Sequence, residues 1–291
     1  MERIKPNFLI VGAARSGTTS LYDWLKQNPD VFLPNLKEPC YFVYGHGISN
    51  WDDYLSLFEP ARSKKAIGEA SVQYLDAEES PSWIHQVLGD VKIVILLRNP
   101  IERAFSLYSL SVMRGTEWIP SFEKALAEEE SRFQDESFHH RELSTYFRHF
   151  FYFRGGLYYE QVKRYLDTFG SEFVRVYLFE DLANSPDKTY NDVCNFIGVS
   201  HEVRPVFTHQ NRSGVPRSIK LQYLLYSLER SPRRLPGILR FVNHQLICLN
   251  IRVGPKTVIP QAVKKVLQEK YRTDIVRLAE LIHRDLSLWL S

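Results

Sequence analysis

Residues Lys92–Leu97 form a continuous run of β-branched and aliphatic side chains, and this run constrains the fold more than any other feature of the sequence. A strand that is apolar on both faces is typical of a parallel sheet covered by helices on both sides. Three further segments are predicted strands: Phe8–Val11, Ala66–Glu69 and Phe173–Phe179. Amphipathic helices are predicted at residues 18–27, 81–88 and 99–114, and from residue 185 onward. The alternation predicts an α/β fold, in which right-handed crossovers build a central parallel sheet flanked by helices.

Length and composition limit the number of domains and the kinds of partner. The chain has 291 residues, of which 44% are hydrophobic and 24% charged, enough for one domain over residues 1–291, with or without an appendage. Its net charge of +3 is too small to favour nucleic acid as a partner. An acidic run, Glu117–Glu136, is interpreted as solvated surface. A basic run, Arg212–Arg240, fits either solvated surface or an anionic ligand.

The C-terminal third contains a stretch with a looser pattern, residues 231–260, that holds several prolines and glycines. Inside it, the apolar segment Ile238–Ile251 is interpreted as a packed helix rather than as a membrane or partner surface. Residues 261–291 are predicted to form a final amphipathic helix that docks on the sheet.

The cysteines and the N-terminal residues bear on the compartment. Cys40, Cys194 and Cys248 are odd in number, lie far apart and lack metal-ligand spacing, which favours a reducing environment over a disulfide framework. The segment Met1–Asn7 is polar and the first apolar run is short, so neither a signal peptide nor a membrane span is expected. The sequence therefore predicts a soluble, cytoplasmic protein.

A glycine-containing loop joins the first predicted strand directly to the first predicted helix, and it reads Gly12-Ala13-Ala14-Arg15-Ser16-Gly17-Thr18-Thr19. Small residues between two glycines let backbone N–H groups turn toward an anion, and the helix N-terminus adds its dipole and unpaired donors. A plain strand-to-helix turn is the alternative. The context favours a phosphate-binding loop.

The loop departs from the nucleoside triphosphatase pattern at one decisive position. Thr18 stands where that pattern needs a lysine for the β- and γ-phosphates. The neighbouring strand ends in Leu97-Arg98, a cation, where such enzymes place an aspartate that helps to hold Mg²⁺. Both departures predict a site that binds phosphate without a metal ion and without a triphosphate tail.

Several segments in this order resemble the sulfotransferases that use 3′-phosphoadenosine 5′-phosphosulfate (PAPS), and most closely their glycan-modifying branch. "GAARSGTTSLYDWL" is similar to the family's 5′-phosphosulfate loop, and "IVILLRNPIERAFSLYSLSVMRG" to its 3′-phosphate segment. "KAIGEASVQYL" resembles the segment that carries a glutamate base, and "NRSGVPRS" the late loop that closes over the nucleotide. The resemblance covers Phe8 to about Arg217 and Lys270 to the end, and implies a single P-loop-like three-layer domain with PAPS as co-substrate and no metal.

The resemblance implies a role for individual residues of this chain. Arg98 and Ser106 are expected to bind the 3′-phosphate. The remaining nucleotide contacts are expected from two loops, one around the 5′-phosphate and one acting as a lid: Arg15, Ser16, Gly17, Thr18, Thr19 and Ser20, then Arg212, Ser213, Gly214 and Arg217.

Two residues are expected to be catalytic. Glu69 is expected to remove the acceptor's proton, and its alternative is a structural carboxylate paired with Arg15 or Lys37. Arg15 is expected to stabilise charge on the transferring group and on the bridging oxygen, although many relatives carry Lys there. Lys37 matches a basic position and is assigned to substrate binding, with a solvated loop lysine as the alternative.

The acceptor is the least constrained part of the prediction. A carbohydrate is the leading candidate, while a lipid, polyketide-type or small phenolic acceptor stays open. Residues 231–260 are expected to border the acceptor site as an insertion. Two other classes of protein are alternatives to a sulfotransferase: a P-loop kinase for a small metabolite, and a scaffold protein that has lost catalysis. The sequence does not define the oligomeric state.

Overall fold

The computed structural model describes residues 3–139, 147–207, 214–230, 236–252 and 258–291. Two compact units are distinguished by the contacts between their Cα atoms. The first unit consists of Met1–Asn99, Leu157–Gln210 and Thr273–Trp289, and the second of Pro100–Gly156, Asn211–Arg272 and Leu290–Ser291. The single-domain interpretation of the sequence stays a prediction.

The first unit is built on a parallel five-stranded sheet with the strand order β2-β3-β1-β4-β5. At its centre, every residue of β1 is buried, as expected for a strand covered on both faces. The strand bounds are Phe8–Gly12 for β1, Val31–Phe32 for β2, Ala66–Ala70 for β3, Lys92–Leu97 for β4 and Val174–Leu178 for β5. The predicted central parallel sheet is confirmed.

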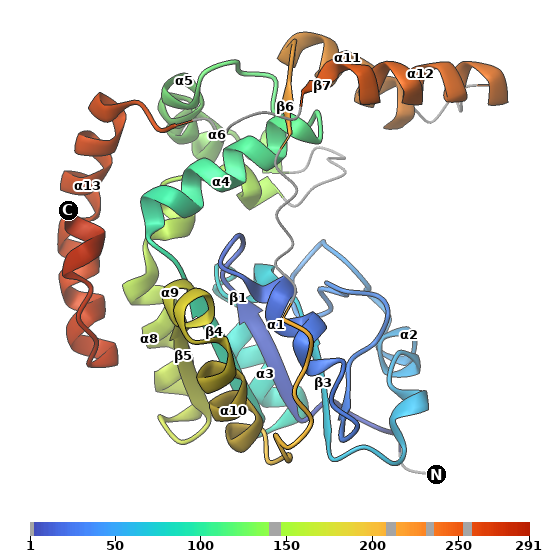
Figure 1. The fold of residues 1–291 in the computed structure, drawn as a ribbon, viewed down its shortest axis with the longest axis vertical. Helices are drawn as coiled ribbons and strands as arrows, with labels where there is room; N and C mark the ends of the chain where they lie inside the picture. The colour runs from blue at the N-terminus through green and yellow to red at the C-terminus, as the bar shows by residue number, and fades with distance from the viewer. Residues whose placement is uncertain (1–2, 140–146, 208–213, 231–235, 253–257) are drawn as a thin grey trace. The chain divides into compact units, whose positions relative to one another are not determined.

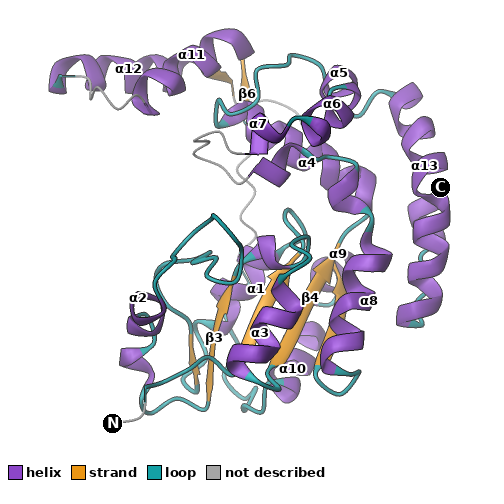
Figure 2. Ribbon diagram, turned by 180° about the vertical axis from the view of Figure 1, so that it is seen from behind, coloured by secondary structure: helices purple, strands orange, loops and turns teal. Residues whose placement is uncertain are grey.

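Helices cover both faces of this sheet and complete three layers. The helices α1 and α10 lie on the face seen in Figure 1, and α3 and α8 lie on the face seen in Figure 2. Alternate side chains of β1, Phe8 and Ile10, are buried in one core with Leu21 and Trp24 of α1 and Val193 of α10. The bounds are Thr18–Leu25 for α1, Trp51–Ser56 for α2, Ser80–Leu88 for α3, Tyr158–Phe169 for α8, Phe179–Asn184 for α9 and Pro186–Phe196 for α10.

The final helix is shorter than predicted. The helix α13 runs from Gln261 to Ile282, where His283 takes a left-handed conformation with φ 53°, a common way for a helix to end. A short 3₁₀ turn, Ser287–Leu290, follows it. The residues after α13 contact α9 within the first unit, since Arg284 pairs with Asp181 at 2.8 Å and the indole of Trp289 donates to Glu180 at 3.1 Å.

The second unit is largely helical. It contains α4 (Pro100–Met113), α5 (Phe122–Ala127), α6 (Glu129–Gln134), α7 (Glu136–His139), α11 (Ile219–Arg230) and α12 (Gly237–Asn250), together with the 3₁₀ turns Phe147–Phe150 and Arg154–Gly156. A two-stranded antiparallel ribbon pairs β6 (Val215–Pro216) with β7 (Ile251–Arg252). Among the helices of the described ranges, none is long and apolar enough to cross a membrane.

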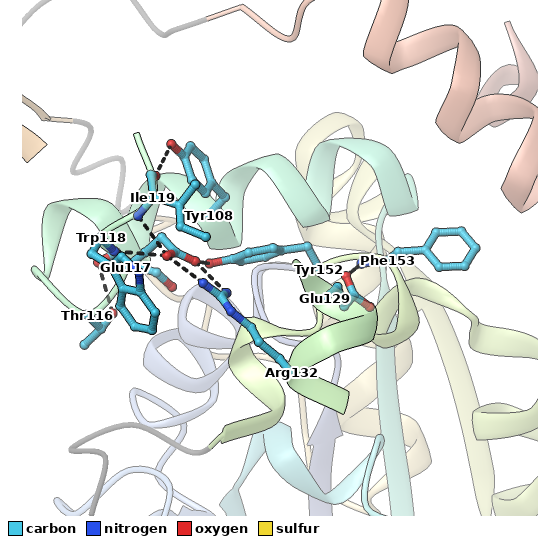
Figure 3. Close-up of polar contacts among 10 residues, drawn as sticks. Tyr108, Thr116, Glu117, Trp118, Ile119, Glu129, Arg132, Tyr152 and Phe153 are labelled. Atoms are coloured by element: carbon cyan, nitrogen blue, oxygen red, sulfur yellow. Dashed lines mark hydrogen bonds and ion pairs between the residues drawn. The ribbon is translucent and has the colours of Figure 1, made fainter. Parts of the chain in front are cut away.

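A buried ion pair holds the second unit together (Figure 3). Two hydrogen bonds of 2.8 and 2.9 Å join the guanidinium of Arg132 to the carboxylate of Glu117, and the Tyr152 hydroxyl donates to that carboxylate at 2.7 Å. The side chains of Glu117 and Arg132 are 0% and 6% exposed. The backbone N–H groups of Trp118 and Ile119 also donate to Glu117. This part of the acidic run is therefore buried and neutralised, which corrects the interpretation of Glu117–Glu136 as solvated surface.

Removing one member of this pair should destabilise the protein. In a Glu117→Ala variant Arg132 stays buried without its counter-charge, so we expect the free energy of unfolding to fall by about 3–5 kcal/mol. Urea denaturation followed by circular dichroism measures the change. Glu130→Ala is the control, because Glu130 is an exposed member of the same acidic run, and it should change stability little. Equal effects of the two substitutions would contradict the role of the buried pair.

Candidate functional site

The loop between β1 and α1 has the backbone geometry of an anion-binding turn. Gly17, the residue before α1, has φ 93°, and no side chain caps the helix there. A Cβ atom on Gly12 would lie 2.6 Å from the Cβ of Leu75, so only glycine fits at that end of the loop. The amide of Ala13 donates to the carbonyl of Leu96 on β4 at 2.6 Å, which fixes the loop to the sheet. The first N–H groups of a helix have no acceptor within it, so this end of α1 can bind an anion.

Two loop residues carry features that fit a bound phosphate. Arg15 is exposed and has φ 70°, a left-handed conformation that costs a non-glycine residue on the order of 1–3 kcal/mol. Ser16 is fully buried, and its hydroxyl has no hydrogen-bond partner among the described residues. A buried hydroxyl without a partner is costly, and a phosphate oxygen would satisfy it.

Lys37 contacts the same loop. Its ammonium donates to the Thr19 hydroxyl at 2.9 Å and lies 3.4 Å from the carboxylate of Glu38. The backbone of this segment is tied to the end of β3 by the amide of Glu38, which donates to the carbonyl of Ala70 at 3.0 Å. The side chain of Lys37 is 23% exposed, which is less than a solvated loop lysine would be. The structure therefore brings Lys37 to the first turn of α1, as its assignment to the site requires.

Glu69 is a buried carboxylate on β3, paired in register with Leu9 of β1. It accepts hydrogen bonds from the Tyr54 hydroxyl at 3.3 Å and from the Ser71 hydroxyl at 2.8 Å. Burial raises the pKa of Glu69 to about 7, while hydrogen bonds from Tyr74, Ser71 and Tyr54 lower it in part. A carboxylate that titrates near neutral pH is suited to take a proton, because its protonated form is accessible at the operating pH.

The raised pKa of Glu69 predicts a pH dependence. A base must be ionised to act, so kcat/KM of a reaction in which Glu69 takes the proton should rise about tenfold per pH unit below the pKa and level off above it. Since the pKa of Glu69 is about 7, the change of slope is expected near neutral pH. Initial rates between acidic and alkaline pH measure this profile. A rate that is flat across neutral pH, or one that falls with rising pH, would contradict the prediction.

Arg98 follows the last residue of β4 and belongs to the first unit. The parallel pairing of β1 with β4 puts their carboxyl ends, and hence Arg98 and the phosphate loop, at the same edge of the sheet. The Arg98 guanidinium lies 4.7 Å from the ring centre of Phe179, and the Arg98 carbonyl accepts a hydrogen bond from Tyr158 at 3.0 Å. This position fits the predicted contact of Arg98 with a phosphate.

Thr18 and Ser20 lie in the first turn of α1, next to the phosphate loop, whereas the remaining predicted nucleotide contacts lie in the second unit or outside the described residues. Ser106 is a partly exposed residue of α4, and its pairing with Arg98 on one phosphate stays a prediction. Gly214 precedes β6, and Arg217 is exposed, with its amide donating to the carbonyl of Asn250. Arg212 and Ser213 lie outside the described residues. The lid assigned to these four residues therefore also stays a prediction.

Sequence reasoning missed three hydrogen-bond partners of Glu69, the hydroxyls of Tyr74, Ser71 and Tyr54. Ser71 lies two residues after Glu69, a spacing that puts two side chains on the same face of a strand, so this signal was present in the sequence. Tyr54 comes from α2, and no local pattern connects it to β3. Ser71 also accepts a hydrogen bond from the amide of Cys40 at 3.0 Å, which joins the carboxylate to the segment that carries Lys37.

The three-layer sheet, the phosphate loop and the arginine after β4 define a P-loop-like nucleotide-binding unit. The family model described as "Sulfotransferase domain" matches residues 5–216, and the chain belongs to this family. Its members transfer sulfuryl groups, and PAPS is their general donor. The predicted family is confirmed.

Individual relatives agree with this assignment. A crystal structure of a sulfotransferase from Alicyclobacillus acidocaldarius superposes with a TM-score of 0.76 at 32% identity, covering 99% of this chain and 100% of that one. Heparan sulfate glucosamine 3-O-sulfotransferase 6 from Homo sapiens is 28% identical over 284 residues, 96% of this chain and 72% of that protein. Membrane-associated sulfotransferase kil1 from Dictyostelium discoideum is 32% identical over 109 residues, 37% of this chain and 23% of that protein.

Proposed function

We propose that this protein transfers a sulfuryl group from PAPS to a hydroxyl or amine of an acceptor. The observation that carries the proposal is the arrangement in the first unit, where a buried carboxylate with a pKa near neutrality lies on the strand next to the phosphate loop. In a member of the sulfotransferase family, this arrangement puts a general base next to the site that binds the sulfuryl donor. A kinase would need a lysine at the position of Thr18.

The proposed reaction is an in-line displacement at sulfur. The acceptor oxygen or nitrogen forms a bond to sulfur while the bond from sulfur to the bridging phosphate oxygen breaks, and adenosine 3′,5′-bisphosphate leaves with that electron pair. Glu69 takes the proton that the acceptor loses. Arg15 stabilises the charge that develops on the bridging oxygen, as a preorganised cation. Lys37, held at Thr19, binds the transferring group or the acceptor.

The proposed nucleotide site uses no metal ion. Backbone N–H groups and hydroxyls from Ser16 to Ser20 bind the 5′-phosphate at the N-terminus of α1. Arg98 binds the 3′-phosphate, and the parts assigned by the resemblance to Ser106, Arg212, Ser213, Gly214 and Arg217 stay predictions. Activity that survives treatment with EDTA would support this arrangement, and restoration of lost activity by Mg²⁺ would contradict it.

Arg98 should discriminate between nucleotides. An Arg98→Ala variant is expected to bind adenosine 3′,5′-bisphosphate at least about tenfold more weakly, because charge-assisted hydrogen bonds to a phosphate are lost. Its affinity for adenosine 5′-phosphosulfate should change little. Isothermal titration with both nucleotides measures the difference. Equal weakening of the affinities for both nucleotides would show that Arg98 does not bind the 3′-phosphate.

A carbohydrate is the proposed acceptor. The likeness to heparan sulfate glucosamine 3-O-sulfotransferase 6 and to heparan sulfate glucosamine 3-O-sulfotransferase 3B1 of Mus musculus supports it. The relevant test is transfer of ³⁵S from labelled PAPS to separate panels of glycans, lipids and phenols. Preferential labelling of glycans supports this acceptor class, whereas exclusive labelling of lipids or phenols would overturn the acceptor while leaving the transferase intact.

The cytoplasm is the proposed location. Cys40, Cys194 and Cys248 are all free thiols, which fits a reducing compartment. Fractionation of cells that express the full chain, with alkylation of the thiols before lysis, tests this placement. Oxidised cysteines in a secretory fraction would contradict it.

A further inference from the structure

The helices α11 and α12 form a hairpin whose packed side combines buried amides with the buried apolar side chains of Leu225 and Ile247. Asn243 of α12 donates to the carbonyl of Leu225 at 3.0 Å, and Asn250 donates to the carbonyl of Ser218 at 2.9 Å and to the side chain of Gln222 at 2.7 Å. Gln222, Asn243 and Asn250 are all buried. The side-chain amides of Gln222, Asn243 and Asn250 thus hold the two helices of the hairpin together instead of facing water.

The opposite side of the hairpin is apolar and exposed. Nine large apolar side chains leave between 40% and 81% of their surface in water: Leu221, Leu224 and Leu228 of α11, and Ile238, Leu239, Phe241, Val242, Leu246 and Leu249 of α12. Spacings of three and four residues put the α12 members on one side of that helix. The interpretation of Ile238–Ile251 as a packed helix is therefore wrong for most of its apolar residues, because the asparagines occupy the packed side.

The exposed side chains give the hairpin an extensive apolar surface. Since each leaves 40% or more of its surface in water, together they expose on the order of several hundred Å² of apolar surface. The largest apolar patch on a typical monomer measures about 300–600 Å² and is often functional. Such a surface indicates a partner.

The same segment is strongly basic. Residues 217–256 contain eight Lys and Arg and one acidic residue, Glu229, whereas the remaining chain contains 29 Lys and Arg against 33 Asp and Glu. The segment thus carries a formal charge of +7 in a chain whose net charge is +3. Among its described cations, four are exposed: Arg217, Lys220, Arg240 and Arg252.

We propose that the α11–α12 hairpin docks on the surface of a bilayer that contains anionic phospholipids. Such a surface offers acyl chains for the apolar side and negative headgroups for the cations. A second copy of the chain would bring another hairpin of formal charge +4 (residues 219–250) against the first, and a sulfated polysaccharide would leave the apolar side in water. The apolar side chains enter the boundary between headgroups and acyl chains, and the exposed cations Lys220, Arg240 and Arg252 contact the headgroups.

Vesicle flotation of the full chain tests the proposal. The protein should float with vesicles of phosphatidylcholine mixed with phosphatidylglycerol, and bind vesicles of phosphatidylcholine alone at least about tenfold more weakly. Raising the salt concentration should release it, because screening weakens the attraction of the cations. Failure to bind the mixed vesicles, or equal binding to both compositions, would overturn the proposal.

A matched pair of variants separates the hairpin from general surface hydrophobicity. Ile238→Ser/Leu249→Ser changes side chains that are 81% and 69% exposed, and Leu288→Ser/Val206→Ser changes side chains of the first unit that are 79% and 70% exposed. The hairpin variant should lower the partition coefficient on mixed vesicles by roughly tenfold or more. Each substitution removes an aliphatic chain that is exposed in the free protein and that the bilayer would bury. The control variant should partition as the wild type does. Equal losses would contradict the proposal.

A charge series and the oligomeric state complete the test. Replacing Lys220, Arg240 and Arg252 by Gln should weaken binding about fivefold per residue. The same change at Arg62, Lys188 and Arg204, cations of the first unit, should have little effect.

Light scattering gives the mass of the protein without vesicles. A dimer that Ile238→Ser/Leu249→Ser converts to monomer, together with absent vesicle binding, would assign the surface to a second copy and overturn the proposal.

Discussion

Replacing Glu69 by Gln is expected to lower kcat for sulfuryl transfer by about 10²–10⁴, the range that a positioned general base contributes. The carboxylate is buried, and its pKa is raised to about 7. The amide cannot take the acceptor's proton. Because Gln keeps one oxygen that can accept from the hydroxyls of Tyr54 or Ser71, the local structure should survive.

Two measurements separate loss of the base from loss of the fold. Glu69→Gln should keep its affinity for adenosine 3′,5′-bisphosphate, and its residual activity should lose the rise with pH below neutrality. The control is Glu38→Gln, which changes a nearby carboxylate that lies beside Lys37, and it should retain most of the turnover. If kcat of Glu69→Gln stays within about tenfold of wild type, Glu69 is not the base.

Replacing Arg15 by Ala is expected to lower kcat by about 10²–10³, the usual effect of removing one group that stabilises developing charge. Arg15 is exposed and held with φ 70° in the phosphate loop. A cation there should act more strongly in the transition state than on bound PAPS, so KM should change less than kcat.

Arg15→Lys is the matched control for this substitution. Lysine and alanine both carry a Cβ atom, so the left-handed backbone is strained equally in the two variants. Lysine restores the positive charge that alanine removes. We therefore expect Arg15→Lys to recover much of the activity that Arg15→Ala loses. Full activity of Arg15→Ala in single-turnover experiments would exclude Arg15 from the reaction.

Much of the first unit could be predicted because its signals are local. The strand Lys92–Leu97 agrees with its predicted bounds, since a doubly covered strand is apolar throughout. The phosphate loop was predicted from its glycines and from the strand and helix beside it. In the second unit the sequence was less informative, because the burial of Glu117 depends on Arg132, fifteen residues away, and on Tyr152.

The hairpin shows how a periodic pattern can mislead. The apolar periodicity of Ile238–Ile251 predicts a helix correctly, but periodicity alone does not say which side of the helix is packed. The hydrogen bonds of Asn243 and Asn250 decide this, and they need partners from α11. In the site, Glu69 and Lys37 were predicted from segments that resemble a family, whereas the contact of Tyr54 with Glu69 required the fold.

The most direct test of the account is calorimetric titration of the full chain with adenosine 3′,5′-bisphosphate in the presence of EDTA, beside ATP with Mg²⁺. The account predicts tight binding of the bisphosphate without metal, lost on removal of the 3′-phosphate from the nucleotide, and much weaker binding of ATP. Tight binding of ATP that requires Mg²⁺, with no binding of the bisphosphate, would contradict it.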